Sequence, residues 1–164
     1  MLTASVGLVR SGFRMRWHRT LYGAWLVLRG NQLWAALPVN DPDGARRYME
    51  RFYRLVAADS GASLDSVEAA RLEVEWWRVH RERQHRPPGT PPTEALVDAI
   101  TDLYAFVYGC ERSEVRAAAD LRARAMDVSD RWVAGGCVEG DPLVAEERAL
   151  LVRSYASLLA AVHR

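Results

Sequence analysis

The chain has 164 residues, of which 49% are hydrophobic and 26% charged, and its formal net charge is +1. This length and composition fit one globular domain over residues 1–164 with a proper hydrophobic core. A chain so close to neutrality lacks the electrostatic footprint of a nucleic-acid-binding protein, so nucleic acid is not expected as a partner. All 22 basic residues are arginine, a bias that suggests a GC-rich bacterial genome.

The first 40 residues carry five arginines and no acid, together with Trp17, Trp25 and Trp34. Such a basic and aromatic stretch suits phosphate or a membrane surface. Alternatively, it forms a buried first helix whose arginines face acids elsewhere in the fold. Residues 1–12 are expected to be a flexible N-terminal segment without the basic start of a signal peptide. No apolar run is long enough to span a membrane.

Helical periodicity recurs along the whole chain and strand signals are nearly absent, which predicts an all-α protein. Six helices are expected, at about 13–36, 43–58, 65–86, 93–108, 114–134 and 143–163. Asp41-Pro42 and Asp141-Pro142 each combine an N-cap with a proline at the first helical position. Ser113 is the expected cap of the fifth helix. The proline-rich stretch at 87–93 is interpreted as a stiff connection rather than a domain boundary.

A weak internal repeat is suggested by three tyrosines, Tyr53, Tyr104 and Tyr155, which lie 51 residues apart near the ends of the even-numbered helices. The predicted architecture is therefore a six-helix bundle, built as three helical hairpins if the repeat is real. In an up-and-down bundle the third and fifth helices run parallel. Six charged positions of the third helix then meet opposite charges on the fifth, among them Glu73 with Arg122 and Arg78 with Asp127.

The stretch LEVEWWRVHR, residues 72–81, is the most informative motif for function. At 100° per residue, Glu68, Arg71, Glu75, Arg78 and Glu82 share a solvent-facing sector. Glu73 and His80 instead share a line between two apolar faces, one with Val67, Ala70, Val74 and Trp77, the other with Leu72, Trp76 and Val79. A buried carboxylate must be paired, protonated or hydrated, because an ionised one without a partner costs several kcal/mol.

Arg122 is the expected partner of Glu73, because it falls in the apolar sector of the fifth helix. His163 is a further polar residue on an apolar face, together with Val152, Ala156 and Leu159 of the sixth helix. One interpretation is a pocket in which Glu73 and His80 are catalytic and Trp76, Trp77, Arg122 and His163 bind a small anionic ligand. The other is a satisfied polar network that fixes the register of the helices.

Cofactor and metal motifs are missing, so neither a cofactor nor a metal is expected. Carboxylate metal sites in bundles need Glu-x-x-His on two helices, and phosphate-binding or nucleophile motifs are not found either. Cys110 and Cys137 have no metal spacing, which suggests reduced thiols and a cytoplasmic location.

Two hypotheses for function remain. The first is an interaction or oligomerisation module that uses the aromatic first helix or the charged faces to bind a protein partner or itself. The second is a cofactor-independent enzyme or anion-binding protein with a pocket around Glu73, His80 and Arg122. Exposed tryptophans on the first helix would favour the first hypothesis, because large exposed apolar patches mark interfaces. An enclosed cavity would favour the second.

Overall fold

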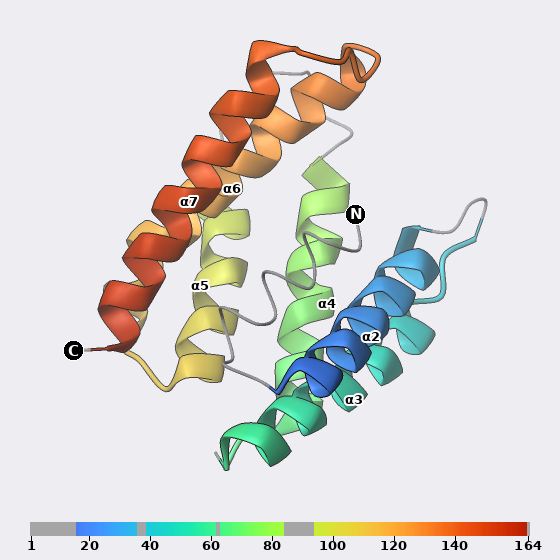
Figure 1. Cartoon of the computed structure of the whole chain (residues 1–164), viewed down its shortest axis with the longest axis vertical. Helices are drawn as coiled ribbons and strands as arrows, with labels where there is room; N and C mark the ends of the chain where they lie inside the picture. The colour runs from blue at the N-terminus through green and yellow to red at the C-terminus, as the bar shows by residue number, and fades with distance from the viewer. Residues whose placement is uncertain (1–15, 36–38, 62, 84–93, 164) are drawn as a thin grey trace. The chain divides into compact units, whose positions relative to one another are not determined.

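The structure is a computed structural model that describes residues 16–35, 39–61, 63–83 and 94–163. The predicted N-terminal segment 1–12 and the proline-rich stretch 87–93 lie outside these residues. The described part contains six helices and no strand, which confirms the all-α class (Figure 1). They are α2 Trp17–Ala35, α3 Pro42–Ser60, α4 Ser66–Arg83, α5 Glu94–Tyr108, α6 Arg112–Ala134 and α7 Pro142–Val162.

Both predicted Asp-Pro caps are confirmed. The Asp41 carboxylate accepts a hydrogen bond of 2.7 Å from the Gly44 backbone N–H at the start of α3. The Asp141 carboxylate accepts one of 2.9 Å from Leu143 at the start of α7. These bonds satisfy backbone donors that a helix start leaves without an intrahelical partner.

The predicted cap at Ser113 is wrong, because α6 begins earlier, at Arg112. The carboxylate of Glu114 accepts a hydrogen bond of 3.1 Å from the Glu111 backbone N–H. This side chain-to-backbone bond fixes the start of the helix one turn before the carboxylate. Ser113 therefore lies inside the first turn, where it is exposed.

The chain divides into two compact units, one up to Val74 and one from Glu75 onward. The boundary falls inside α4, so the first half of this helix belongs to the first unit and the second half to the other. The prediction of a single domain stays a prediction, as does the internal repeat.

The first unit is an antiparallel α2–α3 hairpin with the first half of α4. Arg19 near the start of α2 forms an ion pair of 2.9 Å with Asp59 near the end of α3, while the Leu33 carbonyl accepts from the Asp41 N–H at the other end. Buried side chains of this unit include Ala24, Leu26, Ala45, Met49, Phe52, Tyr53, Val56, Ala69, Ala70, Leu72 and Val74.

The second unit contains the end of α4 and the helices α5, α6 and α7 (Figure 1). Ion pairs from Arg116 to Glu94 and from Arg112 to Asp102 make α5 and α6 antiparallel. The Ser154 hydroxyl donates 2.8 Å to the Ala118 carbonyl, and Arg131 pairs with Glu146, so α6 and α7 are also antiparallel. Leu96, Val97, Ile100, Leu103, Val115, Val128 and Leu158 are among the buried residues.

Within this unit α4 and α6 run parallel, as expected from the sequence. The Arg122 guanidinium lies 5.7 Å from the Trp76 ring, and about two turns further along both helices Arg83 lies 3.9 Å from Asp130. Helix direction therefore alternates from α4 to α7, which is the arrangement of an up-and-down bundle.

Candidate functional site

The residues predicted to form a pocket divide between the two units. Glu73 belongs to the first unit, whereas Trp76, Trp77, His80, Arg122 and His163 belong to the second. The predicted pair of Glu73 with Arg122 joins the two units and therefore stays a prediction. Within each unit, the contacts of these residues are well defined.

Glu73 is half-buried and accepts a hydrogen bond of 2.6 Å from the Tyr53 hydroxyl. Tyr53 lies on α3 and is 3% exposed. The bond connects α3 to the first half of α4 and gives the carboxylate a donor in the protein interior, which reduces the cost of removing it from water.

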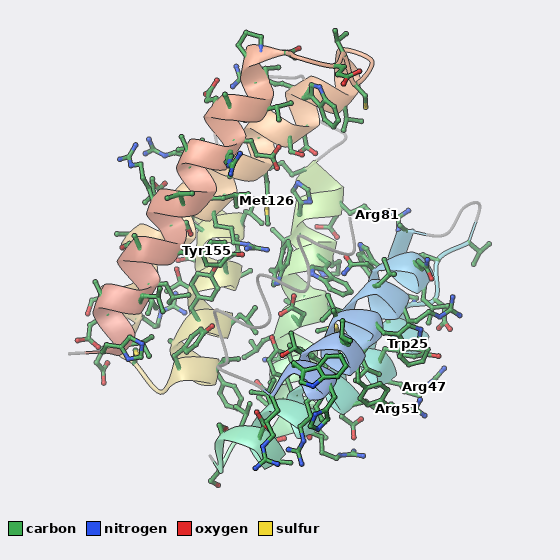
Figure 2. All side chains as sticks on the ribbon, in the orientation of Figure 1. Trp25, Arg47, Arg51, Arg81, Met126 and Tyr155 are labelled. Atoms are coloured by element: carbon green, nitrogen blue, oxygen red, sulfur yellow. The ribbon has the colours of Figure 1, made fainter. Side chains whose placement is uncertain are left out.

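Arg122 contacts two aromatic rings of the second unit, and its guanidinium carbon lies 5.7 Å from the Trp76 ring centre and 5.9 Å from the Tyr155 ring centre. It also donates a hydrogen bond of 2.6 Å to the Tyr155 hydroxyl. Figure 2 shows Tyr155 on α7, on the side of the helix that faces the interior of this unit. Trp77 is 4% exposed and packs edge-to-face against Trp76. Trp76, one of the two tryptophans of the expected pocket, therefore contacts Arg122, while the pocket itself stays a prediction.

The two hydrogen bonds between a tyrosine and a charged residue involve positions that are equivalent in the suggested internal repeat. Tyr53 and Tyr155 were two of the repeated tyrosines, and Glu73 and Arg122 occupied equivalent places when the third and fifth helices were aligned. In one unit the tyrosine hydroxyl donates to a carboxylate, and in the other it accepts from a guanidinium. A hydroxyl serves equally well in either direction.

A second polar cluster joins the end of α4 to α6. His80 Nε2 lies 3.0 Å from Asp130 Oδ2, and the His80 side chain is 19% exposed. Arg83 is 8% exposed and forms an ion pair with Asp127. His80 was expected from the sequence to point inward, whereas Arg83, only three residues further along the same side of the helix, was not recognised as a buried residue.

The predicted charge pairing between α4 and α6 is partly replaced by pairing within α4. Arg78 donates to Glu75 and Glu82 of its own helix, and these hydrogen bonds raise the pKa of Arg78, Glu75 contributing most. Asp127, expected opposite Arg78, pairs with Arg83 instead. Helix neighbours three or four residues apart are always within reach, so they compete with partners on another helix.

His163 lies at the exposed end of α7 rather than in the interior. The face that it shares with Val152, Ala156 and Leu159 is also exposed. The inward face of α7 consists of Ser154, Leu158 and Ala161. Because α7 is apolar around much of its circumference, its sequence alone does not decide which side is buried. Val67, expected on an apolar face of α4, is likewise 57% exposed, because it lies in the first turn beside the Asp65 cap.

The exposed side of α2 carries a row of large apolar side chains, which we call the aromatic surface: Trp17, Leu21, Tyr22 and Trp25. Tyr22 and Trp25 stack at 5.8 Å, and Trp25 meets Tyr48 of α3 edge-on. Arg51 lies over the Tyr48 ring at 5.5 Å. Arg47, also on α3, is exposed like Arg51, and both are labelled in Figure 2. Trp34, the third tryptophan of α2, is only half-exposed.

Among the described residues, no group of three or more His, Cys, Asp or Glu side chains is arranged to hold a metal ion. Within the same residues, no helix is both long and apolar enough to cross a membrane. Comparison with protein-family models, with curated proteins and with solved structures gives no match to this chain. Its function must therefore be inferred from its own contacts and surfaces.

Proposed function

We propose that this protein is an interaction module of the cytosol, and that a partner protein docks on the aromatic surface. The observation that carries the proposal is the exposure of Trp17, Leu21, Tyr22 and Trp25, at 69%, 45%, 48% and 43%. Burying a fully exposed side chain of this size contributes about 1.5–3 kcal/mol, and these partly exposed side chains forgo a corresponding part of it. Contiguous exposure on one helix face is typical of a binding surface.

The composition of the aromatic surface suits a protein partner. Tryptophan and tyrosine are the residues most often found to dominate binding energy at interfaces. The rings of Tyr22, Trp25 and Tyr48 already pack against one another. Side chains held in place before binding lose less conformational entropy when a partner docks.

Charge around the aromatic surface favours a partner with acidic residues. The helix α2 contains no acid, and the exposed Arg51 of α3 lies over the Tyr48 ring that Trp25 contacts. Arg47 of α3 is exposed as well. Arg47 lies 3.9 Å from Asp41, an exposed pair that water screens strongly. A basic rim speeds the encounter with an acidic surface and selects against basic ones.

A photo-crosslinking amino acid at Leu21 tests the proposal in the native host. We expect a discrete adduct with one protein from this position, and none from the exposed Ala117 on α6, the control position. The adduct should disappear in a Trp17→Ser/Trp25→Ser variant with unchanged helix content. The same adducts from both positions, or no adduct from Leu21, would contradict the proposed surface.

A cytosolic location is supported by Cys110 and Cys137, which are both free thiols. Free thiols persist where the environment is reducing.

The alternative function, a cofactor-independent enzyme or anion-binding protein, is favoured by one observation. Arg122 lies against Trp76 and donates a hydrogen bond to Tyr155. An arginine side chain ordered in this way presents a planar set of donors that suits a carboxylate or a phosphate. Native mass spectrometry of untagged protein distinguishes the two. A retained small molecule that is lost in Arg122→Ala would support the alternative, and apo protein throughout would count against it.

A further inference from the structure

A second exposed apolar surface lies on α7, far from α2 in the sequence. Its members, which we call the α7 seam, are Pro142, Ala145, Ala149, Val152, Ala156 and Leu159, and all of them are exposed. They follow one another at alternating intervals of three and four residues. This spacing places them on a single line and is the pattern by which two helices pack along their length. Val152 and Leu159 are 61% and 42% exposed.

The α7 seam faces away from the rest of its unit. Ser154, Leu158 and Ala161 are the buried residues of α7, and the Ser154 hydroxyl is bonded to the Ala118 carbonyl of α6. The two faces are therefore on opposite sides of the helix. Alanine at three of the six positions of the seam, Ala145, Ala149 and Ala156, allows another helix to approach closely, at the short end of the 8–10 Å range of helix packing.

Charges beside the seam select a second copy of the same helix in the antiparallel direction. In one antiparallel register, Pro142 lies opposite Leu159 of the second copy, Ala145 opposite Ala156, and Ala149 opposite Val152. All six layers of this contact are apolar. Glu146 then lies beside Arg153 of the second copy, twice by symmetry, and both side chains are exposed.

Other arrangements of two α7 helices bring like charges together. A shift of one heptad from this register places Arg153 beside Arg153 of the second copy. In a parallel pair, Arg148 meets Arg153 and Asp141 meets Glu146, because flanking residues five apart pair in that direction. Like charges at such positions oppose pairing. Only the first antiparallel register combines a continuous apolar seam with opposite charges.

We propose that two copies of this protein associate through the α7 seam as an antiparallel, two-fold symmetric dimer. Such an interface uses the same patch on both copies. The contact runs over 18 residues, Pro142 to Leu159, or about 27 Å of helix. A contact made by one helix from each copy buries an area at the low end for a specific interface, so we expect a reversible dimer that forms at concentrations on the order of micromolar. The surface differs from the aromatic surface, so either proposal can fail alone.

Sedimentation analysis across the micromolar range tests the dimer, and charge reversal tests its register. Glu146→Arg alone and Arg153→Glu alone each place like charges beside one another, and each should weaken self-association at least about tenfold. An equal mixture of the two variants should form a heterodimer, because every flanking pair is then opposite in charge. Arg131→Gln is the control. It removes the partner that Glu146 has within the same chain, at 3.2 Å, and leaves the charges that face the second copy unchanged.

Cysteine pairs test the direction of the two helices. In a Cys110→Ser/Cys137→Ser background, Ala145→Cys mixed with Ala156→Cys should crosslink on oxidation, whereas Ala145→Cys by itself should not. Crosslinking of Ala145→Cys to itself would show a parallel pair and overturn the proposal. A wild-type protein that stays monomeric throughout, or charge variants that all dimerise equally, would also overturn it.

Discussion

The hydroxyl of Tyr53 on α3 donates a hydrogen bond of 2.6 Å to Glu73 on α4, and Tyr53 is only 3% exposed. This bond explains how the sequence tolerates a carboxylate on the inner side of an amphipathic helix. The hydroxyl takes over the hydrogen bond of a water molecule that the carboxylate loses when it is buried. A hydrogen bond to a charged group typically contributes about 1.5–3 kcal/mol.

Tyr53→Phe is expected to lower the free energy of unfolding by about 2 kcal/mol, because the ring stays and only the donor is lost. A double-mutant cycle with Glu73→Gln, followed by urea unfolding, measures the coupling of the two side chains. We expect about 1–2 kcal/mol of coupling. Additive effects of the two substitutions would show that the bond contributes nothing to stability.

Asp127→Asn is expected to destabilise the protein by about 3 kcal/mol, because it leaves Arg83 buried with a weaker partner. The side chains of Arg83 and Asp127 are only 7% and 12% exposed. Asp120→Asn on the same helix is a matched control, since its pair with Arg124 is exposed and should contribute less than about 1 kcal/mol. Equal losses of stability in the two variants would contradict this role for Arg83.

The carboxyl group of Glu68 should titrate at a lower pH than an ordinary glutamate. Hydrogen bonds of 2.7 Å from Arg71 to both carboxylate oxygens lower the pKa of Glu68. Because the folded-state pKa lies below the unfolded one, the contribution to stability is present above the unfolded pKa. It is lost as the pH falls through the folded pKa.

Carbon-detected NMR titration of the Glu68 carboxyl group measures this shift directly. Arg71→Gln should return the pKa of Glu68 toward its usual value, while Arg124→Gln, which removes a charge on another helix, should leave it unchanged. A Glu68 pKa that is the same with and without Arg71 would rule out the proposed cause.

Cys137 should react with a thiol reagent faster than Cys110. Cys137 is exposed in the turn between α6 and α7, whereas Cys110 is half-buried, and burial raises its pKa, with Glu114 adding to the effect. A higher pKa lowers the fraction of reactive thiolate at neutral pH. Mass spectrometry of briefly alkylated protein gives the order of modification, and Cys110→Ser and Cys137→Ser variants assign each rate.

Local sequence signals determined the helices of this protein. The Asp-Pro caps at Asp41 and Asp141 and the 3.6-residue periodicity placed the helices to within a few residues, because a cap and an amphipathic face act over one or two turns. The parallel direction of α4 and α6 followed from the order of alternating helices. The same periodicity places Leu96, Ile100 and Leu103 on one face of α5, and all three are buried.

Only the tertiary structure decided which polar groups pair and which apolar faces are left exposed. Tyr53 was not recognised as the partner of Glu73, nor Arg83 as the partner of Asp127, because a pair between helices depends on their rotation and offset. His163 was expected inside and lies outside. The helix α7 is apolar on two sides, and its hydrogen bonds to Ala118 and Arg122 on α6 determine which side is buried. Local periodicity fixes the faces of a helix, whereas packing against its neighbours selects the face that loses contact with water.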